Sequence, residues 1–169
     1  MPIDGCHNTF EEIVSTVLPT RFHELIAAKD AAYDASIFTA HKSATKRLLG
    51  QLGRKEDFPG CYVLYEGNRA MYVGISRFVV RRLTQHLCSS SPNSATLAYK
   101  LAKEDRQAKG NPDRLMENPA FKSAFDEKQR RLQAMRVAFV AISDPVTMHL
   151  FEVYTAMKLD AVWNHFRTH

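Results

Sequence analysis

The stretch that most constrains the fold is residues 58–87, FPGCYVLYEGNRAMYVGISRFVVRRLTQHL. Two short β-prone runs, residues 61–65 and 71–73, flank the turn-like segment 66–69, and this pattern predicts a β-hairpin. After the second run the apolar residues move to helical spacing, so a helix is expected from about residue 78. The rest of the chain is organised around this strand, turn, strand and helix.

Four polar side chains stand out in that stretch. A hairpin brings Tyr62 and Tyr72 to neighbouring strand ends, and Arg82 and His86 are four residues apart on the expected helix, so they share a face. Two phenols, a guanidinium and an imidazole suit an anion from which a proton must be moved. Taken singly, each has a more common structural role: a packed tyrosine, a solvated arginine or a core histidine.

The order of these residues resembles a known motif. The triplets GCY at 60–62 and YVG at 72–74, followed by Arg82 and His86, resemble the GIY-YIG nuclease family. The ten-residue step between the tyrosines and the eight-residue step from Gly74 to Arg82 both fit the family pattern. The resemblance covers about residues 58–166.

The resemblance also implies roles for residues outside the hairpin. The family has a glutamate on a later helix and an asparagine further on, and Glu152 and Asn164 fill these places. Glu152 would hold one Mg²⁺ or Mn²⁺ ion, and Arg82 would bind the scissile phosphate. Gly60, Gly74 and Asn164 would be structural or orienting residues.

The general base is open at this point. The resemblance favours Tyr62, with Tyr72 and His86 orienting the water or sharing its proton. A phenol has a pKa near 10 and needs positive charge nearby to act at neutral pH, whereas histidine is the natural base on its pKa alone. Both alternatives stand.

The hairpin is flanked by helical segments. Residues 1–55 are expected to form an N-terminal helical extension, with helices over 10–29 and 34–52 and a bend or break at Pro19. Residues 56–169 would be the nuclease-like domain, with a basic helical insert at about 89–136. The extension either covers one face of the sheet or binds a partner.

The later part of the chain completes a small sheet. Residues 137–142, VAFVAI, predict a buried strand, and residues 147–159 a helix. The expected buried stripe of that helix is Leu150, Val153, Tyr154 and Met157. The predicted fold is α+β: a small three-stranded mixed or antiparallel sheet flanked by helices.

Excess positive charge favours a polyanionic partner. The net charge is +5, and residues 97–136 contain ten Lys and Arg against six Asp and Glu. Helices are expected over 96–109 and 121–136, where the basic residues either contact phosphates or form a solvated face. The candidate nucleic-acid-binding residues are Arg77, Arg81, Lys100, Lys103, Arg130 and Arg131.

Composition indicates a cytoplasmic protein. No apolar run reaches the length of a membrane span, no secretory signal is visible, and three cysteines show no paired metal spacing. Together with the resemblance, this predicts a metal-dependent DNA endonuclease, with RNA as an alternative substrate and either a monomer or a homodimer. The competing hypotheses are a nucleic-acid-binding module that does not cleave, and a protein-interaction role on a vestigial nuclease fold.

Overall fold

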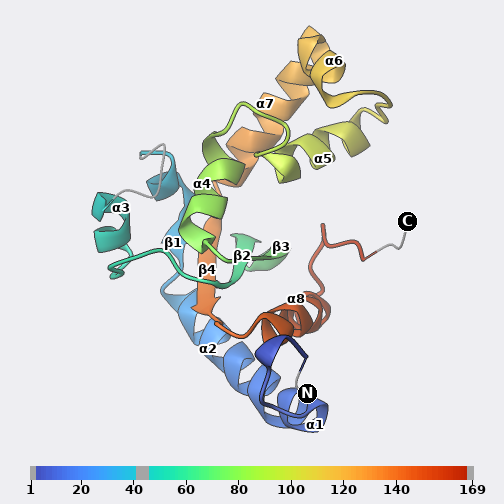
Figure 1. The fold of residues 1–169 in the computed structure, drawn as a ribbon. Helices are drawn as coiled ribbons and strands as arrows, with labels where there is room; N and C mark the ends of the chain where they lie inside the picture. The colour runs from blue at the N-terminus through green and yellow to red at the C-terminus, as the bar shows by residue number, and fades with distance from the viewer. Residues whose placement is uncertain (1–2, 41–45, 167–169) are drawn as a thin grey trace. The chain divides into compact units, whose positions relative to one another are not determined.

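The computed structural model describes residues 3–40 and 46–166 of an α+β protein (Figure 1). Its four-stranded antiparallel sheet has the strand order β1-β4-β2-β3. These strands are β1 (Tyr33–Asp34), β2 (Gly60–Glu66), β3 (Arg69–Ser76) and β4 (Arg136–Ala141). The sequence predicted three strands, and the two-residue β1 was missed because it is too short to show alternation.

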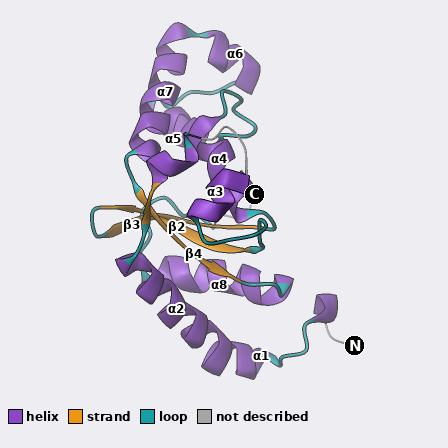
Figure 2. Ribbon diagram, turned by 90° about the vertical axis from the view of Figure 1, so that its left-hand side faces the viewer, coloured by secondary structure: helices purple, strands orange, loops and turns teal. Residues whose placement is uncertain are grey.

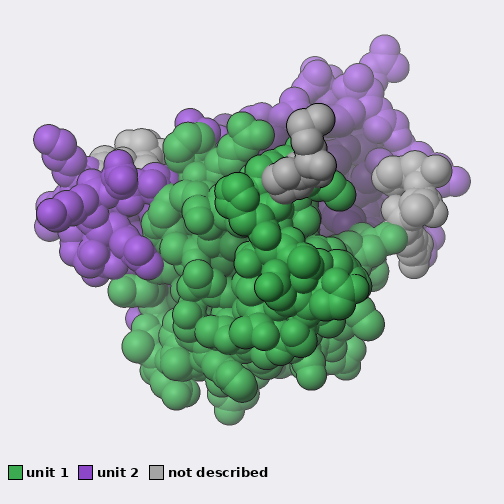
Figure 3. Space-filling view, turned by 60° about the horizontal axis from the view of Figure 1, so that its bottom comes forward, with its two compact units in different colours: residues 1–33, 58–79, 136–169 green, residues 34–57, 80–135 purple. Residues whose placement is uncertain are grey.

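The chain divides into two compact units, coloured green and purple in Figure 3. We call residues 1–33, 58–79 and 136–169 the sheet unit, and residues 34–57 and 80–135 the helical unit. These boundaries differ from the expected extension and insert, since residues 1–33 group with the sheet and residues 34–57 with the later helices. The sequence places the charge unevenly: net +7 in the helical unit and −2 in the sheet unit.

The predicted hairpin is present in the sheet unit. Strands β2 and β3 are antiparallel, with Tyr62 opposite Gly74 and Leu64 opposite Tyr72. On its other side β2 pairs with β4, where Gly60 lies opposite Ala141. A Cβ on Gly60 would lie 2.2 Å from the Val140 carbonyl oxygen, so the close approach of β2 and β4 requires glycine there.

A helix of 21 residues, 10–30, opens the sheet unit. It consists of α1 (Phe10–Glu12), a π-helical turn (Ile13–Val17) and α2 (Leu18–Asp30). Thr9 and Glu12 form a capping box at its start. Pro19 does not divide this helix: it lies in the first turn of α2, directly after the π-helical turn, where a missing N–H is tolerated.

One face of the sheet is covered by α2 and by α8 (Pro145–Lys158), which lie on the same side in Figure 2. The predicted buried stripe of α8 was wrong for Val153 and Met157, which are 39% and 75% exposed, whereas Leu150 and Tyr154 are partly buried against the core. The helix also buries Met148, Phe151 and Ala156, which the sequence did not single out. Apolar residues lie nearly all round this helix, so periodicity does not select the face that packs.

The helical unit contains five helices among its described residues. They are α3 (Lys46–Gln51), α4 (Val79–Cys88, from its second residue), α5 (Thr96–Asp105), α6 (Pro112–Glu117) and α7 (Pro119–Gln133). Helices α5 and α7 pack side by side, and α6 packs on α7 (Figure 1). Asn111 and Asn118 cap α6 and α7 through their side chains.

The predicted helix over 34–52 was wrong in its first half. Residues 33–34 form β1 and Ala35–Phe38 forms a 3₁₀ turn, while residues 41–45 lie outside the described part of the chain. Tertiary contacts override helix propensity here, because the Ala35 N–H donates to the Met135 carbonyl and Phe38 is fully buried. Where the described part of the chain begins again, α3 covers Lys46–Gln51, inside the predicted range.

Two further observations bear on the class of protein. None of the helices in the described ranges combines the length and apolarity needed to cross a bilayer. Cys6, Cys61 and Cys88 all lie in those ranges and are free thiols.

Candidate active site

The two motif tyrosines lie together on the hairpin of the sheet unit. Their ring centroids are 6.3 Å apart and their planes are tilted by 51°. Tyr62 is almost fully buried and Tyr72 is half-buried. The phenol of Tyr62 lies over Gly74, where an added Cβ would be 2.5 Å from the Tyr62 hydroxyl oxygen. The second glycine of the motif therefore makes room for the first tyrosine.

Asn164 holds the C-terminal segment against β3. Its side-chain amide donates to the Val73 carbonyl and its side-chain oxygen accepts from the Val73 N–H, each at 2.8 Å. The Trp163 N–H donates to the Met71 carbonyl at 2.8 Å beside it. Val73 lies between Tyr72 and Gly74, so Asn164 fixes the backbone that carries the second tyrosine.

Glu152 lies on α8 in the same unit, half-buried. Burial raises the pKa of its carboxyl group, and the opposing effect of His149 is smaller. Burial raises the pKa of the Cys61 thiol, and the negative charge of Glu152 adds to this increase. Among the described residues no hydrogen bond or ion pair satisfies the Glu152 carboxylate.

The surroundings of Glu152 suit one weakly held hard cation. A desolvated carboxylate without a partner is costly, and a divalent cation offsets that cost. Mg²⁺ needs only one or two carboxylates, because it keeps several of its waters. In the described ranges no cluster of three or more His, Cys, Asp or Glu is present, so the site resembles a single-carboxylate site and not an all-protein cage.

Arg82 and His86 lie in the helical unit, on one face of α4. Arg82 is half-buried and donates to the Ser94 carbonyl at 3.2 Å and to the Thr96 hydroxyl at 2.8 Å. Within the described part of the chain no carboxylate pairs with Arg82. Its positive charge is therefore positioned by neutral groups and is not neutralised by them.

His86 is fully buried. Burial, and to a smaller extent the positive charge of Arg82, lower its pKa to about 3. The imidazole is therefore neutral at physiological pH and a weak base. This removes the pKa argument that favoured His86 over Tyr62 as the general base.

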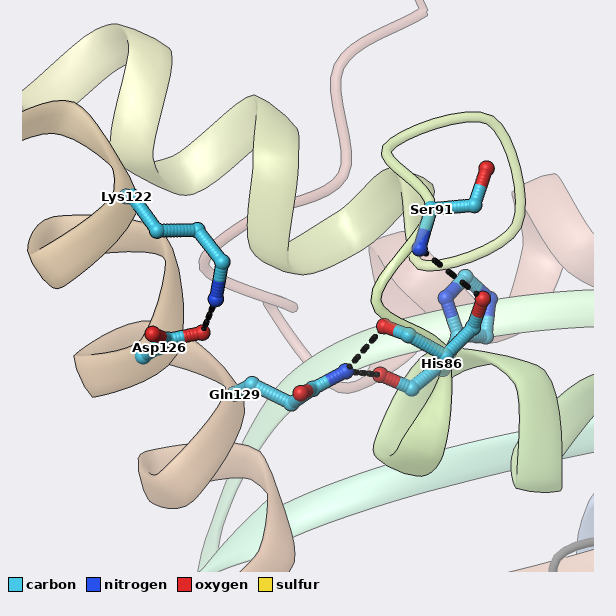
Figure 4. A network of polar contacts seen from close by, with 6 residues as sticks. His86, Ser91, Lys122, Asp126 and Gln129 are labelled. Atoms are coloured by element: carbon cyan, nitrogen blue, oxygen red, sulfur yellow. Dashed lines mark hydrogen bonds and ion pairs between the residues drawn. The ribbon is translucent and has the colours of Figure 1, made fainter. Parts of the chain in front are cut away.

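Both ends of α4 are held by residues that the sequence did not single out. The Asp57 carboxylate accepts from the Val80 and Arg81 N–H groups at 2.9 Å each, which caps the start of the helix. At the other end the Gln129 side chain donates to the carbonyls of His86 and Ser89 (Figure 4). These contacts join residues far apart in the sequence, so no local pattern reveals them.

The candidate nucleic-acid-binding residues are all exposed, with Arg77 in the sheet unit and the others in the helical unit. Lys100 and Lys103 lie on α5, and Arg130 and Arg131 on the last turn of α7. Arg81 follows the start of α4. Exposure leaves all of these side chains accessible to a large anion.

The sheet unit thus gathers Tyr62, Tyr72, Gly74 and Asn164 around one hairpin and carries Glu152 on α8. The helical unit gathers Arg82 and His86 on α4. Comparison of the chain with family models, with curated proteins and with solved structures found no match.

Proposed function

We propose that this chain is an endonuclease of the GIY-YIG type, which hydrolyses phosphodiester bonds in DNA with the help of one divalent metal ion. The observation that carries the proposal is Glu152, a half-buried carboxylate whose pKa is raised by burial and which makes no hydrogen bond or ion pair with the described residues. The paired tyrosines on the hairpin and the unneutralised Arg82 supply the other groups that such a reaction needs.

Each residue has a defined part in the proposed reaction. Arg82 binds the scissile phosphate and offsets the negative charge that grows in the transition state. Tyr62, as its phenolate, accepts the proton of the attacking water and becomes a phenol, and Tyr72 beside it orients the water or shares the proton. Asn164 keeps the Tyr72 backbone in place, and His86 remains neutral beneath Arg82 on the same helix face.

Glu152 would hold one Mg²⁺ or Mn²⁺ ion, which supplies Lewis-acid stabilisation of phosphate oxygens when bound. Gln at this position keeps the size of the side chain and removes its charge. The variant therefore separates the role of the carboxylate from its packing on α8.

Charge supports DNA as the partner. The helical unit carries 16 Lys and Arg against 9 Asp and Glu, so its net charge is +7. Such an excess favours binding to the phosphate backbone, with an affinity that falls steeply as salt rises. The same charge is also what a binding module without cleavage would have, and this is the second candidate function.

Cleavage of plasmid and oligonucleotide DNA separates the two candidates. The wild-type chain is expected to cut in Mg²⁺ or Mn²⁺ and not in EDTA, and Glu152→Gln is expected to lose cutting. Glu127→Gln, which removes an exposed carboxylate from α7, is the matched control and should cut normally. Salt-dependent binding by a wild-type chain that cuts neither duplex, branched nor single-stranded DNA would favour the binding module.

A further inference from the structure

The Arg82 side chain is held by hydrogen bonds within the helical unit. Arginine has a long side chain with several rotatable bonds, and a fixed fork of N–H donors binds phosphate well only when it is correctly aimed. Here the guanidinium makes two hydrogen bonds, one to the backbone carbonyl of Ser94 and one to the hydroxyl of Thr96. Both partners come from the loop and the first residue of α5.

These two partners hold the Arg82 side chain and leave its positive charge and its other N–H groups available for an anion. A guanidinium has five N–H donors, and the two contacts occupy two of them, so three are left for an anion in the described structure. A carbonyl and a hydroxyl are neutral, whereas a carboxylate in their place would neutralise the charge that a phosphate requires.

The Thr96 hydroxyl makes no capping hydrogen bond in α5. Thr96 is the first residue of α5, and the preceding Ala95 makes no side-chain cap. Among the described residues the hydroxyl of Thr96 bonds to Arg82 alone. Valine has nearly the same shape, so Thr96→Val removes this one contact and leaves the start of α5 otherwise unchanged.

We infer that Thr96 is a positioning residue for Arg82: its hydroxyl, with the Ser94 carbonyl, fixes the guanidinium in the orientation that binds the scissile phosphate. This inference rests on the proposed nuclease function for its catalytic consequence. The contact itself is a property of the helical unit and is measurable without cleavage.

The kinetic test uses the full chain and four single variants. Thr96→Val is expected to lower kcat about tenfold with little change in KM, since one hydrogen bond to a charged group is lost. Thr96→Ser keeps the hydroxyl and should retain kcat within about twofold, because the bond to Arg82 remains. Arg82→Ala should lose about 10²–10³-fold, as expected when a group that stabilises transition-state charge is removed.

Thr84→Val is the matched control. Thr84 lies on the same helix as Arg82 and bonds the Val80 carbonyl, so the variant removes a buried hydroxyl from α4 without touching the guanidinium. It should keep the wild-type kcat. A double-mutant cycle adds a second criterion: Thr96→Val should cause no further loss in the Arg82→Ala background.

Side-chain NMR of Arg82 gives a readout that is independent of cleavage. In the wild type and in Thr96→Ser the guanidinium N–H groups should give separate, slowly exchanging signals, which Thr96→Val should average. If the wild type cuts no DNA, the proposed function fails, and these signals still decide the positioning contact. A wild-type kcat in Thr96→Val, an equal loss in the Arg82→Ala background, or averaged signals in the wild type would each overturn the inference.

Discussion

The burial of His86 predicts that acid destabilises the native state through this one side chain. In the unfolded chain a histidine has a pKa of about 6.5, whereas burial lowers the pKa of native His86 to about 3. Between these values the unfolded state binds a proton that the native state does not. The free energy of unfolding therefore falls as the pH drops below 6.5 and stops falling near pH 3.

The size of the effect follows from the two pKa values. Between pH 7 and pH 5, the linkage relation gives a loss of about 2 kcal/mol from His86 alone. That is a large share of the stability of an ordinary domain, which is about 5–15 kcal/mol. The effect should therefore be visible in urea unfolding curves measured at the two pH values.

His86→Met isolates the contribution. The variant fills a similar volume with an uncharged side chain, so its stability should fall by about 2 kcal/mol less than the wild type between pH 7 and pH 5. His23→Met is the control, since it removes an exposed histidine from α2 and should leave the pH dependence of the wild type unchanged. Equal pH dependence in His86→Met and the wild type would refute the buried, neutral imidazole.

Three further outcomes follow from other contacts, each measured by chemical or thermal unfolding. Gly60→Ala should destabilise the protein by about 1–3 kcal/mol because its Cβ would meet the Val140 carbonyl, whereas Gly50→Ala, with no atom within 4 Å, should be neutral or stabilising; equal effects would contradict the close approach. Asn164→Ala should cost about 1–3 kcal/mol through the two lost bonds to Val73, and Asn164→Asp should not rescue it, because Asp cannot donate to the carbonyl. Because burial raises the pKa of Glu152, Glu152→Gln should be more stable than the wild type in EDTA at neutral pH, and this difference should disappear as the pH falls through the pKa of the carboxyl group. Mg²⁺ should raise the Tm of the wild type and leave that of Glu152→Gln unchanged. A Tm rise of the same size in both proteins would contradict metal binding at Glu152.

The parts of the fold set by local pattern were predictable from the sequence. The hairpin, strand β4 and helix α5 each have a clear period and turn signals, and all three are present, although α5 ends at Asp105, four residues earlier than expected. Strand β1 and the 3₁₀ turn after it were not predictable, because long-range contacts to β4 and Met135 decide their conformation. The buried face of α8 was mistaken because apolar residues surround that helix.

The candidate site also has features that local spacing predicts and features that depend on tertiary contacts. The spacing of Tyr62, Tyr72 and Gly74 is local, and the hairpin brings the three together. The full burial of His86 and the contact of Thr96 with Arg82 depend on helices separated by a loop, and no spacing rule contains them. The sequence therefore predicted candidate residues, whereas their burial and their hydrogen bonds depend on the tertiary structure.

The most direct test of the account is the rate at which the purified chain cuts a phosphodiester bond in Mg²⁺, measured side by side for the wild type, Glu152→Gln and Glu127→Gln. The account predicts Mg²⁺-dependent cleavage by the wild type and by Glu127→Gln, and none above background by Glu152→Gln with its fold intact. Cleavage by Glu152→Gln at the wild-type rate would contradict the central role of this carboxylate.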